Sequence, residues 1–217
     1  MGIKALSVIN SIPYLLEGVG VTLQITIMAL VFGAVMGMIV ALARVYGNDF
    51  LRGLAVGYSR IIRSVPLLVI LFMLYFWGSE IVDIPAYWAV VMSLAVHTSA
   101  YQAEIFRGAI QSVSRGQMEA AMALGMSRTQ GIFSVILPQA FRLAIPYWSN
   151  EAAIVLKDSA LAYVLGITEL MRRGEYLSAR TSQPLLTYFI VGLIYFLLTY
   201  LFTKSMSFIE SRVRIPS

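Results

Sequence analysis

The 217-residue sequence contains no cysteine and only one histidine, His97. The absence of cysteine excludes disulfide bonds and thiolate metal sites, and a lone histidine argues against a metal site built from imidazoles. The sequence also lacks the Gly-x-x-x-x-Gly-Lys-[Ser/Thr] loop that cradles nucleotide phosphates. We therefore expect no bound metal or other cofactor and no phosphate-loop ATPase in this chain.

Charged residues are scarce as well. They make up 12% of the chain, hydrophobic residues make up 59%, and the mean hydropathy is +0.80. Soluble domains carry about 25% charged residues. Several apolar runs approach the ~20 residues that a helix needs to cross a bilayer, and they lack the alternation of strands. The expected fold class is therefore an all-α integral membrane protein.

Five apolar segments predict five transmembrane helices in a single transmembrane domain that covers residues 1–217. Residues 1–17 are expected to form a short interfacial helix before the first span. Pro66 is expected to kink the second span, and Pro138 and Pro146 to interrupt the fourth. The predicted spans cover residues 18–43, 51–77, 86–110, 132–157 and 185–209.

The net charge of +5 predicts an orientation in the membrane rather than nucleic-acid binding, because Lys and Arg accumulate in cytoplasmic loops. Five spans put the two termini on opposite sides. Ten basic residues fall on one side: Arg44, Arg52, Arg60, Arg63, Arg107, Arg115, Arg128, Lys204, Arg212 and Arg214. Four fall on the other: Lys4, Arg172, Arg173 and Arg180. The N-terminus is therefore expected outside the cell, and the C-terminus and residues 115–131 in the cytoplasm.

Residues 115–131 form the longest interval with a water-facing side. Gln117 to Leu124 favour a helix, because alanine and methionine are good helix formers and Glu119 complements the helix dipole. Gly125 suits the left-handed conformation that ends a helix, and Ser127 suits the N-cap of a second one. The interval predicts two short helices joined at a glycine, although nothing local excludes an ordinary polar loop.

The order of residues in and after this loop resembles a known pattern. Glu119-Ala120-Ala121 is followed after three residues by Gly125, and after nine more by Val135-Ile136-Leu137-Pro138. This is similar to the EAA loop of ATP-binding-cassette (ABC) importer permeases, E-A-A-x3-G-x9-I-x-L-P, with valine where isoleucine is usual. Three more segments resemble motifs of the polar amino acid subfamily: Arg63 to Leu68 (RSVPLL), Ser99 to Gly108 (SAYQAEIFRG) and Lys157 to Leu161 (KDSAL, with Ala160 replacing a hydroxyl residue).

The resemblance covers residues 63–161 and implies the MetI-like, ABC type I importer permease fold with cytoplasmic coupling helices. It implies a non-catalytic subunit in the bacterial inner membrane. ATP and Mg²⁺ would bind to two separate ATPase subunits. An extracytoplasmic amino-acid-binding protein would deliver a polar amino acid, and a second permease, either another copy or a paralogue, would complete the pathway. The residues that would couple the chain to the ATPase are Met118, Glu119, Ala120, Ala121, Met122, Gly125 and Arg128.

Ionisable residues inside spanning helices are costly and usually face a cavity or the protein interior. Two helix faces form the candidate substrate-binding set: His97, Tyr101 and Glu104 on one, and Tyr147, Asn150, Glu151 and Asp158 on the other. A structural role stays open for some of them. Glu104 can pair with Arg107 or Arg142 to brace helices, Lys157 can neutralise Asp158, and His97 can serve in packing.

Acidic residues outnumber basic ones in this presumed midplane set, which favours a cationic substrate. Arginine, lysine or histidine is expected first and glutamine next. The alternative is a stand-alone ion- or proton-coupled amino acid transporter in which the same acids relay protons, but the EAA-like loop favours the ABC importer. An intramembrane hydrolase is not favoured, because Ser99 lies two residues from His97 and points to another helix face.

Overall fold

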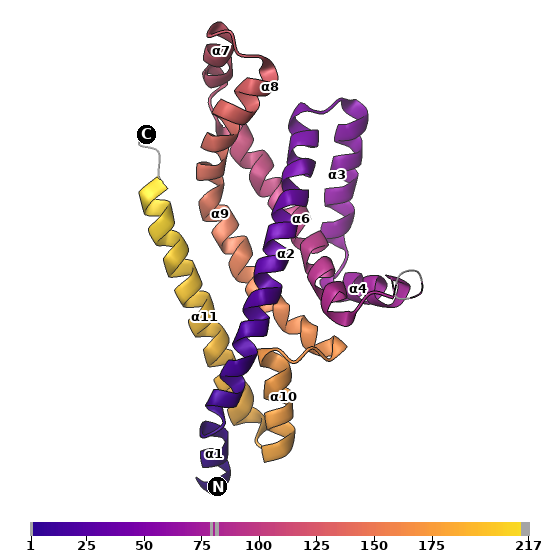
Figure 1. Ribbon diagram of the computed structural model, residues 1–217, viewed down its shortest axis with the longest axis vertical. Coiled ribbons are helices and arrows are strands. Elements are labelled where there is room, and N and C mark those ends of the chain that lie inside the picture. Colours follow the sequence, from indigo (N-terminus) through magenta and orange to yellow (C-terminus); the bar gives the residue numbers. More distant parts are fainter. Residues whose placement is uncertain (1, 79, 81–82, 214–217) are drawn as a thin grey trace. The chain divides into compact units, whose positions relative to one another are not determined.

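The computed structural model describes residues 2–78, 80 and 83–213, and every element in this part of the chain is a helix. This confirms the expected all-α fold class. The helices follow one another along the chain in a single series (Figure 1). Their bounds are α1 (Gly2–Ile9), α2 (Ile12–Tyr46), α3 (Asp49–Ser64), α4 (Leu67–Phe72), η1 (Met73–Trp77), α6 (Ala86–Ser112), α7 (Arg115–Ala123), α8 (Arg128–Gly131), η2 (Ile132–Ile136), α9 (Leu137–Asp158), η3 (Ser159–Leu165), α10 (Leu170–Thr181) and α11 (Pro184–Val213).

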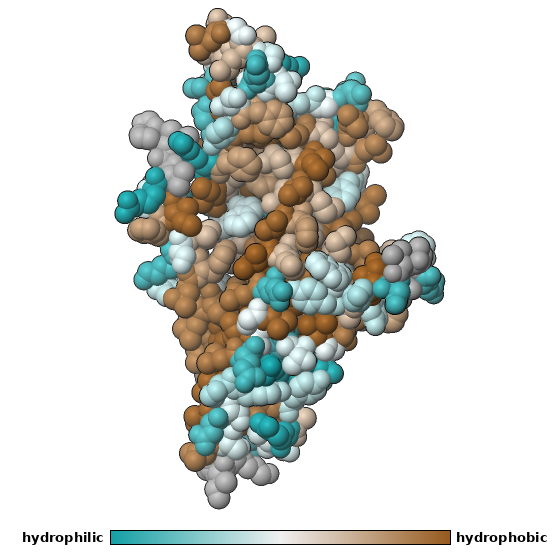
Figure 2. All heavy atoms as spheres, in the orientation of Figure 1, coloured by the Kyte–Doolittle hydropathy of each residue, from teal (hydrophilic) through white to brown (hydrophobic). Residues whose placement is uncertain are grey.

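Two helices in the described part of the chain, α2 and α11, are long and apolar enough to cross a membrane. Hydrophobic side chains cover both of them, whereas hydrophilic ones gather around α10 and α7–α8 (Figure 2). The pair formed by α3 and the α4–η1 helix is a third candidate. The remaining predicted spans, α6 and α9, are 27 and 22 residues long but carry more polar side chains. The five-span arrangement therefore stays a prediction.

The second and fourth predicted spans differ in detail from the expectation. Pro66 does not merely kink a continuing helix, because α3 ends at Ser64 and a separate helix, α4, begins at Leu67. Val65 has the extended backbone (φ −98°, ψ 130°) that a residue before proline prefers. By contrast, α9 continues through Pro146 without interruption. Arg214, which the count of basic residues included, lies outside the described residues.

The chain divides into two compact units, of which the first comprises Met1–Phe32, Pro66–Ala95 and Ala152–Phe202. Its buried apolar cluster joins α1, α2, α10 and α11 through Val8, Leu15, Leu170, Leu177, Val191 and Ile194. Close approach of α2 to α10 depends on Gly18, where a Cβ would lie 2.7 Å from the backbone nitrogen of Leu170. The short helix α10 is therefore an internal part of this unit and not a loose connection between spans.

A fully buried carboxylate, that of Glu169, holds the N-terminal end of α10. It accepts hydrogen bonds from the backbone N–H groups of Met171 and Arg172 at 2.8 and 2.7 Å. The hydroxyl groups of Tyr195 and Thr22 donate to it at 2.9 and 3.4 Å. Burial raises the pKa of this carboxyl group, and the four hydrogen bonds act in the opposite direction. The residue thereby ties α2, α10 and α11 together.

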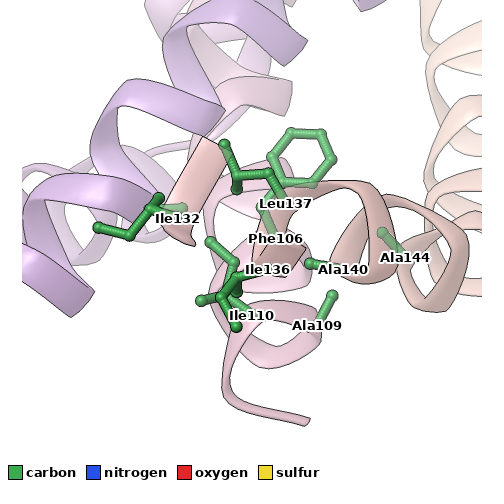
Figure 3. Packing of buried hydrophobic residues seen from close by; sticks show 9 residues of the cluster. Phe106, Ala109, Ile110, Ile132, Ile136, Leu137, Ala140 and Ala144 are labelled. Carbon is green, nitrogen blue, oxygen red and sulfur yellow. The ribbon is translucent and has the colours of Figure 1, made fainter. Parts of the chain in front are cut away.

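The second unit comprises Gly33–Val65, Val96–Glu151 and Thr203–Ser217. Its buried apolar cluster is formed by side chains of α2, α6, η2 and α9. Figure 3 shows how Phe106 and Ile110 from α6 meet Ile136, Leu137 and Ala140 from η2 and α9. This cluster lies directly behind the loop that contains α7 and α8, because Met118 of α7 packs against it.

Gly37 lets α2 pack closely on α6 in this unit. A Cβ at Gly37 would lie 2.9 Å from the backbone oxygen of Ser99, which cannot rotate away as a side chain would. We therefore expect Gly37→Val to destabilise the protein by about 1–3 kcal/mol, the usual cost of overpacking. Thermal unfolding in detergent would measure this. The matched control is Gly53→Ala in α3, where a Cβ meets nothing within 4 Å. Equal stability of both variants would contradict the packing role of Gly37.

Candidate functional site

Residues 115–131, called the coupling segment here after the role that the resemblance implies for them, fold as the two helices α7 and α8 on either side of Gly125. Gly125 has φ +82°, and the chain around it forms a Schellman motif. The N–H of Met126 donates to the carbonyl of Ala121 at 3.1 Å, and the N–H of Gly125 donates to that of Met122 at 3.0 Å. Ser127 begins α8 through a reciprocal capping box with Gln130. Backbone hydrogen bonds thus fix one end of the bend, and the side chains of Ser127 and Gln130 fix the other.

The two faces of α7 differ in what they contact. Ala121 is only 3% exposed, and Met118 packs on the apolar cluster behind it. A Cβ at Gly131 would lie 2.8 Å from the sulfur of Met118, so α7 is seated tightly against the start of α8–η2. In contrast, Met122 is 55% exposed and Leu124 is 81% exposed. The inner side chains therefore anchor the helix, and the outer ones are free to meet another protein.

The charged residues of the coupling segment do not pair with each other. Among the described residues no ion pair joins Glu119 to Arg128, and both side chains are exposed. The guanidinium of Arg128 instead lies 5.9 Å from the centre of the Tyr46 ring. Arg128 thus contacts the Tyr46 ring and does not pair with Glu119 in this structure.

A cavity of about 450 Å³ in the second unit brings together most of the candidate substrate-binding residues. It lies between α6 and α9. Five of the seven candidates line it: Tyr101, Glu104, Tyr147, Asn150 and Glu151. His97 is adjacent, since its ring lies 5.2 Å from that of Tyr101. Asp158 is the last residue of α9 and belongs to the first unit.

Glu151 is the second acidic residue that lines this cavity. It is 7% exposed and accepts a hydrogen bond of 2.7 Å from the hydroxyl of Thr98. The hydroxyl of Thr98 in turn accepts a hydrogen bond of 3.2 Å from the side-chain amide N–H of Gln102. The side-chain oxygen of Gln102 accepts one of 2.8 Å from the indole N–H of Trp148. Thr98, Gln102 and Trp148 thus form a hydrogen-bonded chain between α6 and α9 that ends at the carboxylate of Glu151.

Glu104, in contrast, is surrounded by three guanidinium groups. Its Oε1 lies 2.6 Å from Arg44 and 3.1 Å from Arg63, and its Oε2 lies 2.9 Å from Arg107. The carboxylate thus joins α2, α3 and α6, and the cluster of four residues carries a net positive charge. Pairing with Arg107 was one of the structural alternatives expected for Glu104. Arg63 also lies 5.9 Å from the centre of the Tyr101 ring, beside the cavity.

Arg44 and Arg63 are the site residues that sequence reasoning missed. Both were counted as basic residues of a cytoplasmic loop. Arg63 stands in the RSVPLL segment that resembles a family motif, and this was the one available signal of a role beyond orientation. Arg44 gave no such signal.

Comparison with known proteins shows the family to which this chain belongs. The family described as "Binding-protein-dependent transport system inner membrane component" matches residues 29–215. The nopaline transport system permease protein NocM of Agrobacterium fabrum is 34% identical, over 94% of this chain and 89% of that protein. The arginine permease protein ArtQ of Bacillus subtilis is 31% identical over 99% of both chains. The glutamine permease protein GlnP of Escherichia coli is 33% identical over 94% and 95%.

A solved structure is similar as well. The crystal structure of an amino acid ABC transporter with histidines shares 36% identity and a TM-score of 0.86, covering 95% of this chain and 97% of that one. The family match spans far more than half of the chain, and the three relatives are all amino acid permeases. The chain therefore belongs to the inner membrane components of binding-protein-dependent transport systems, as an amino acid permease of an ABC importer.

Proposed function

We propose that this chain moves polar amino acids, with basic ones preferred, into the cell through the cavity between α6 and α9. The observation that carries the proposal is the chemical asymmetry of that cavity. One wall holds the carboxylate of Glu151, and another adjoins the positively charged cluster around Glu104. An amino acid has the matching pair of charges.

The fit is one of charge and size together. Pockets for small ligands span about 300–1,000 Å³, and the volume of about 450 Å³ lies in that range. An α-carboxylate would face Arg63, whose planar guanidinium binds carboxylates well. An ammonium or guanidinium group would face Glu151. Tyr101, Tyr147 and Asn150 supply an apolar wall and neutral hydrogen-bonding groups.

Glu104 was counted from the sequence as one of the acids that favour a cationic substrate, whereas three guanidinium groups surround its carboxylate. Glu151 is the other acidic residue of the cavity wall, and the preference for basic substrates is proposed on its position there. The arginine permease among the relatives supports a basic substrate, and the glutamine permease supports a neutral one.

Membership of the family implies a separate ATPase, a substrate-binding protein and a dimeric arrangement of permeases. We propose that α7 docks in a groove of the ATPase through its exposed apolar side chains, Met122 and Leu124, while Ala120 permits close approach. Ala121 and Met118, which face the interior of the second unit, would hold α7 in place. The chain would cross the membrane five times, with the coupling segment in the cytoplasm and the N-terminus outside. A second copy of this chain or a paralogue would complete the pathway.

Reconstitution of the assembled complex in liposomes tests this function. ATP hydrolysis would be measured with the binding protein and each common amino acid in turn. We expect the largest stimulation from a basic amino acid, a smaller one from glutamine, and little from aspartate or glutamate. The purified chain alone should show no uptake under a proton gradient. Uptake by the chain alone would instead support the stand-alone transporter.

A further inference from the structure

A second cavity of the second unit, of about 540 Å³, is not used by the proposed transport path. It lies between the C-terminal ends of α2 and α6 and the coupling helices. Its polar wall contains Tyr46, Gln111, Ser114, Arg115 and Arg128. Its remaining wall is apolar and includes Val45, Ile110, Val113 and Ile136. The cavity thus combines two guanidinium groups with an aliphatic surface.

The two arginines are available for an anion. Neither Arg115 nor Arg128 forms an ion pair with any described carboxylate, whereas Arg44, Arg63 and Arg107 all share Glu104. The nearest described partner of the Arg128 guanidinium is the Tyr46 ring, 5.9 Å away. Two like charges that line one cavity without an acidic residue are favourable only when an anion or water compensates them.

The apolar wall selects among anions. A free inorganic anion would leave the aliphatic side chains uncovered, whereas a phosphate that carries an acyl chain would satisfy both walls. The cavity also adjoins the C-terminal end of α2, one of the two helices in the described part of the chain that are apolar enough to span a membrane. Lipid headgroups would lie near that end if α2 crosses the bilayer. Guanidinium groups bind phosphate through two parallel hydrogen bonds. The side chains best suited to a protein groove, Met122 and Leu124, do not line this cavity.

We propose that this cavity binds the phosphate headgroup of an anionic phospholipid, held by Arg115 and Arg128. The lipid would bridge the ends of α2 and α6 to α7–α8. It would therefore restrain the coupling segment, and the strength of ATPase coupling would depend on the anionic lipid content of the membrane. This regulatory consequence rests on the proposed coupling function, but the binding itself does not.

Titration of the detergent-solubilised complex with dioctanoyl phosphatidylglycerol tests the site, with thermal unfolding as the readout. A basic residue near an anionic headgroup contributes ~1 kcal/mol, or about fivefold in affinity. We expect Arg115→Gln and Arg128→Gln each to weaken binding about fivefold, and the double variant about 25-fold. Arg128→Lys should retain part of the affinity, because it keeps the charge and loses the planar fork. Arg52→Gln, an exposed arginine outside the cavity, should bind as the wild type does.

Two further probes identify the source of the phosphate. Dioctanoyl phosphatidylcholine has no net charge, and inorganic phosphate has no acyl chain. Each should therefore bind at least about tenfold more weakly than phosphatidylglycerol. Inorganic phosphate that binds equally well would overturn the lipid assignment. Unchanged lipid affinity in the double variant would also overturn the lipid assignment. So would a double variant that loses the ATPase subunit in every lipid tested. The assay needs neither ATP nor substrate, so a failure of the transport function would not disturb it.

Discussion

Replacing Gly125 with valine is expected to reduce substrate-stimulated ATP hydrolysis by the assembled complex at least about tenfold, to near its basal rate. Gly125 adopts φ +82°, and a β-branched residue in the left-handed region costs about 1–2 kcal/mol, which corresponds to roughly a tenfold change in an equilibrium. Space is not the obstacle, because a Cβ at this position meets nothing within 4 Å. The strain would instead displace the bend between α7 and α8.

The matched control for this prediction is Gly125→Asn. Asparagine tolerates the left-handed conformation better than other side chains do, so most of the coupled activity should remain. Membrane insertion and basal ATP hydrolysis are measured in parallel and should be unchanged in both variants, since neither residue contacts the buried clusters. If the valine variant hydrolyses ATP at the wild-type rate when substrate is added, the coupling role of this segment is wrong.

The second large effect is expected from Glu151→Gln. The substitution preserves shape and still allows Thr98 to donate its hydrogen bond, but it removes the negative charge from the cavity wall. Loss of one partner of a desolvated charge pair costs about 2 kcal/mol or more, so the KM for uptake of arginine in proteoliposomes should rise roughly 30-fold. Uptake of glutamine, which has no charged side chain, should change only slightly.

Glu175→Gln is the control for Glu151→Gln, because Glu175 lies on α10 in the first unit and pairs with Arg172 at 2.7 Å. It makes the same chemical change outside the cavity. An equal loss of arginine and glutamine uptake in the Glu151 variant would indicate a role in folding rather than selectivity. Unchanged kinetics for both amino acids would remove Glu151 from the binding site.

The sequence predicted those parts of the structure that local interactions determine. Gly125 and Ser127 could be recognised because a helix end and an N-cap depend on residues within a few positions of one another. The shared helix faces of α6 and α9 followed from helical periodicity, and five of the seven candidates do line one cavity. The short helix α10 was missed because its mixed composition hides the buried Leu170, Gly174 and Leu177.

The features that the sequence could not predict depend on contacts between distant residues. Arg44 and Arg63 reach Glu104 from two other helices, and no periodicity within one helix reports such a meeting. The same limit applies to the turn at Pro66. Proline explains why α3 stops at Ser64, but the local sequence does not give the direction that the chain takes afterwards. A count of charges along the sequence therefore treated Glu104 as a net negative site, although its three arginine partners make the cluster positive.

The cluster around Glu104 has a consequence for hydration. Three guanidinium groups offer roughly fifteen N–H donors, whereas one carboxylate offers about four acceptor positions. Some of these donors bind protein acceptors, such as the carbonyl of Ser59 and the amide oxygen of Gln111. Those that remain beside the cavity would bind water molecules or the carboxylate of an incoming amino acid. A substrate would enter by exchanging one set of acceptors for another. The cargo would then compete with ordered water for the same donors, so the affinity of the site would depend on how much water is released.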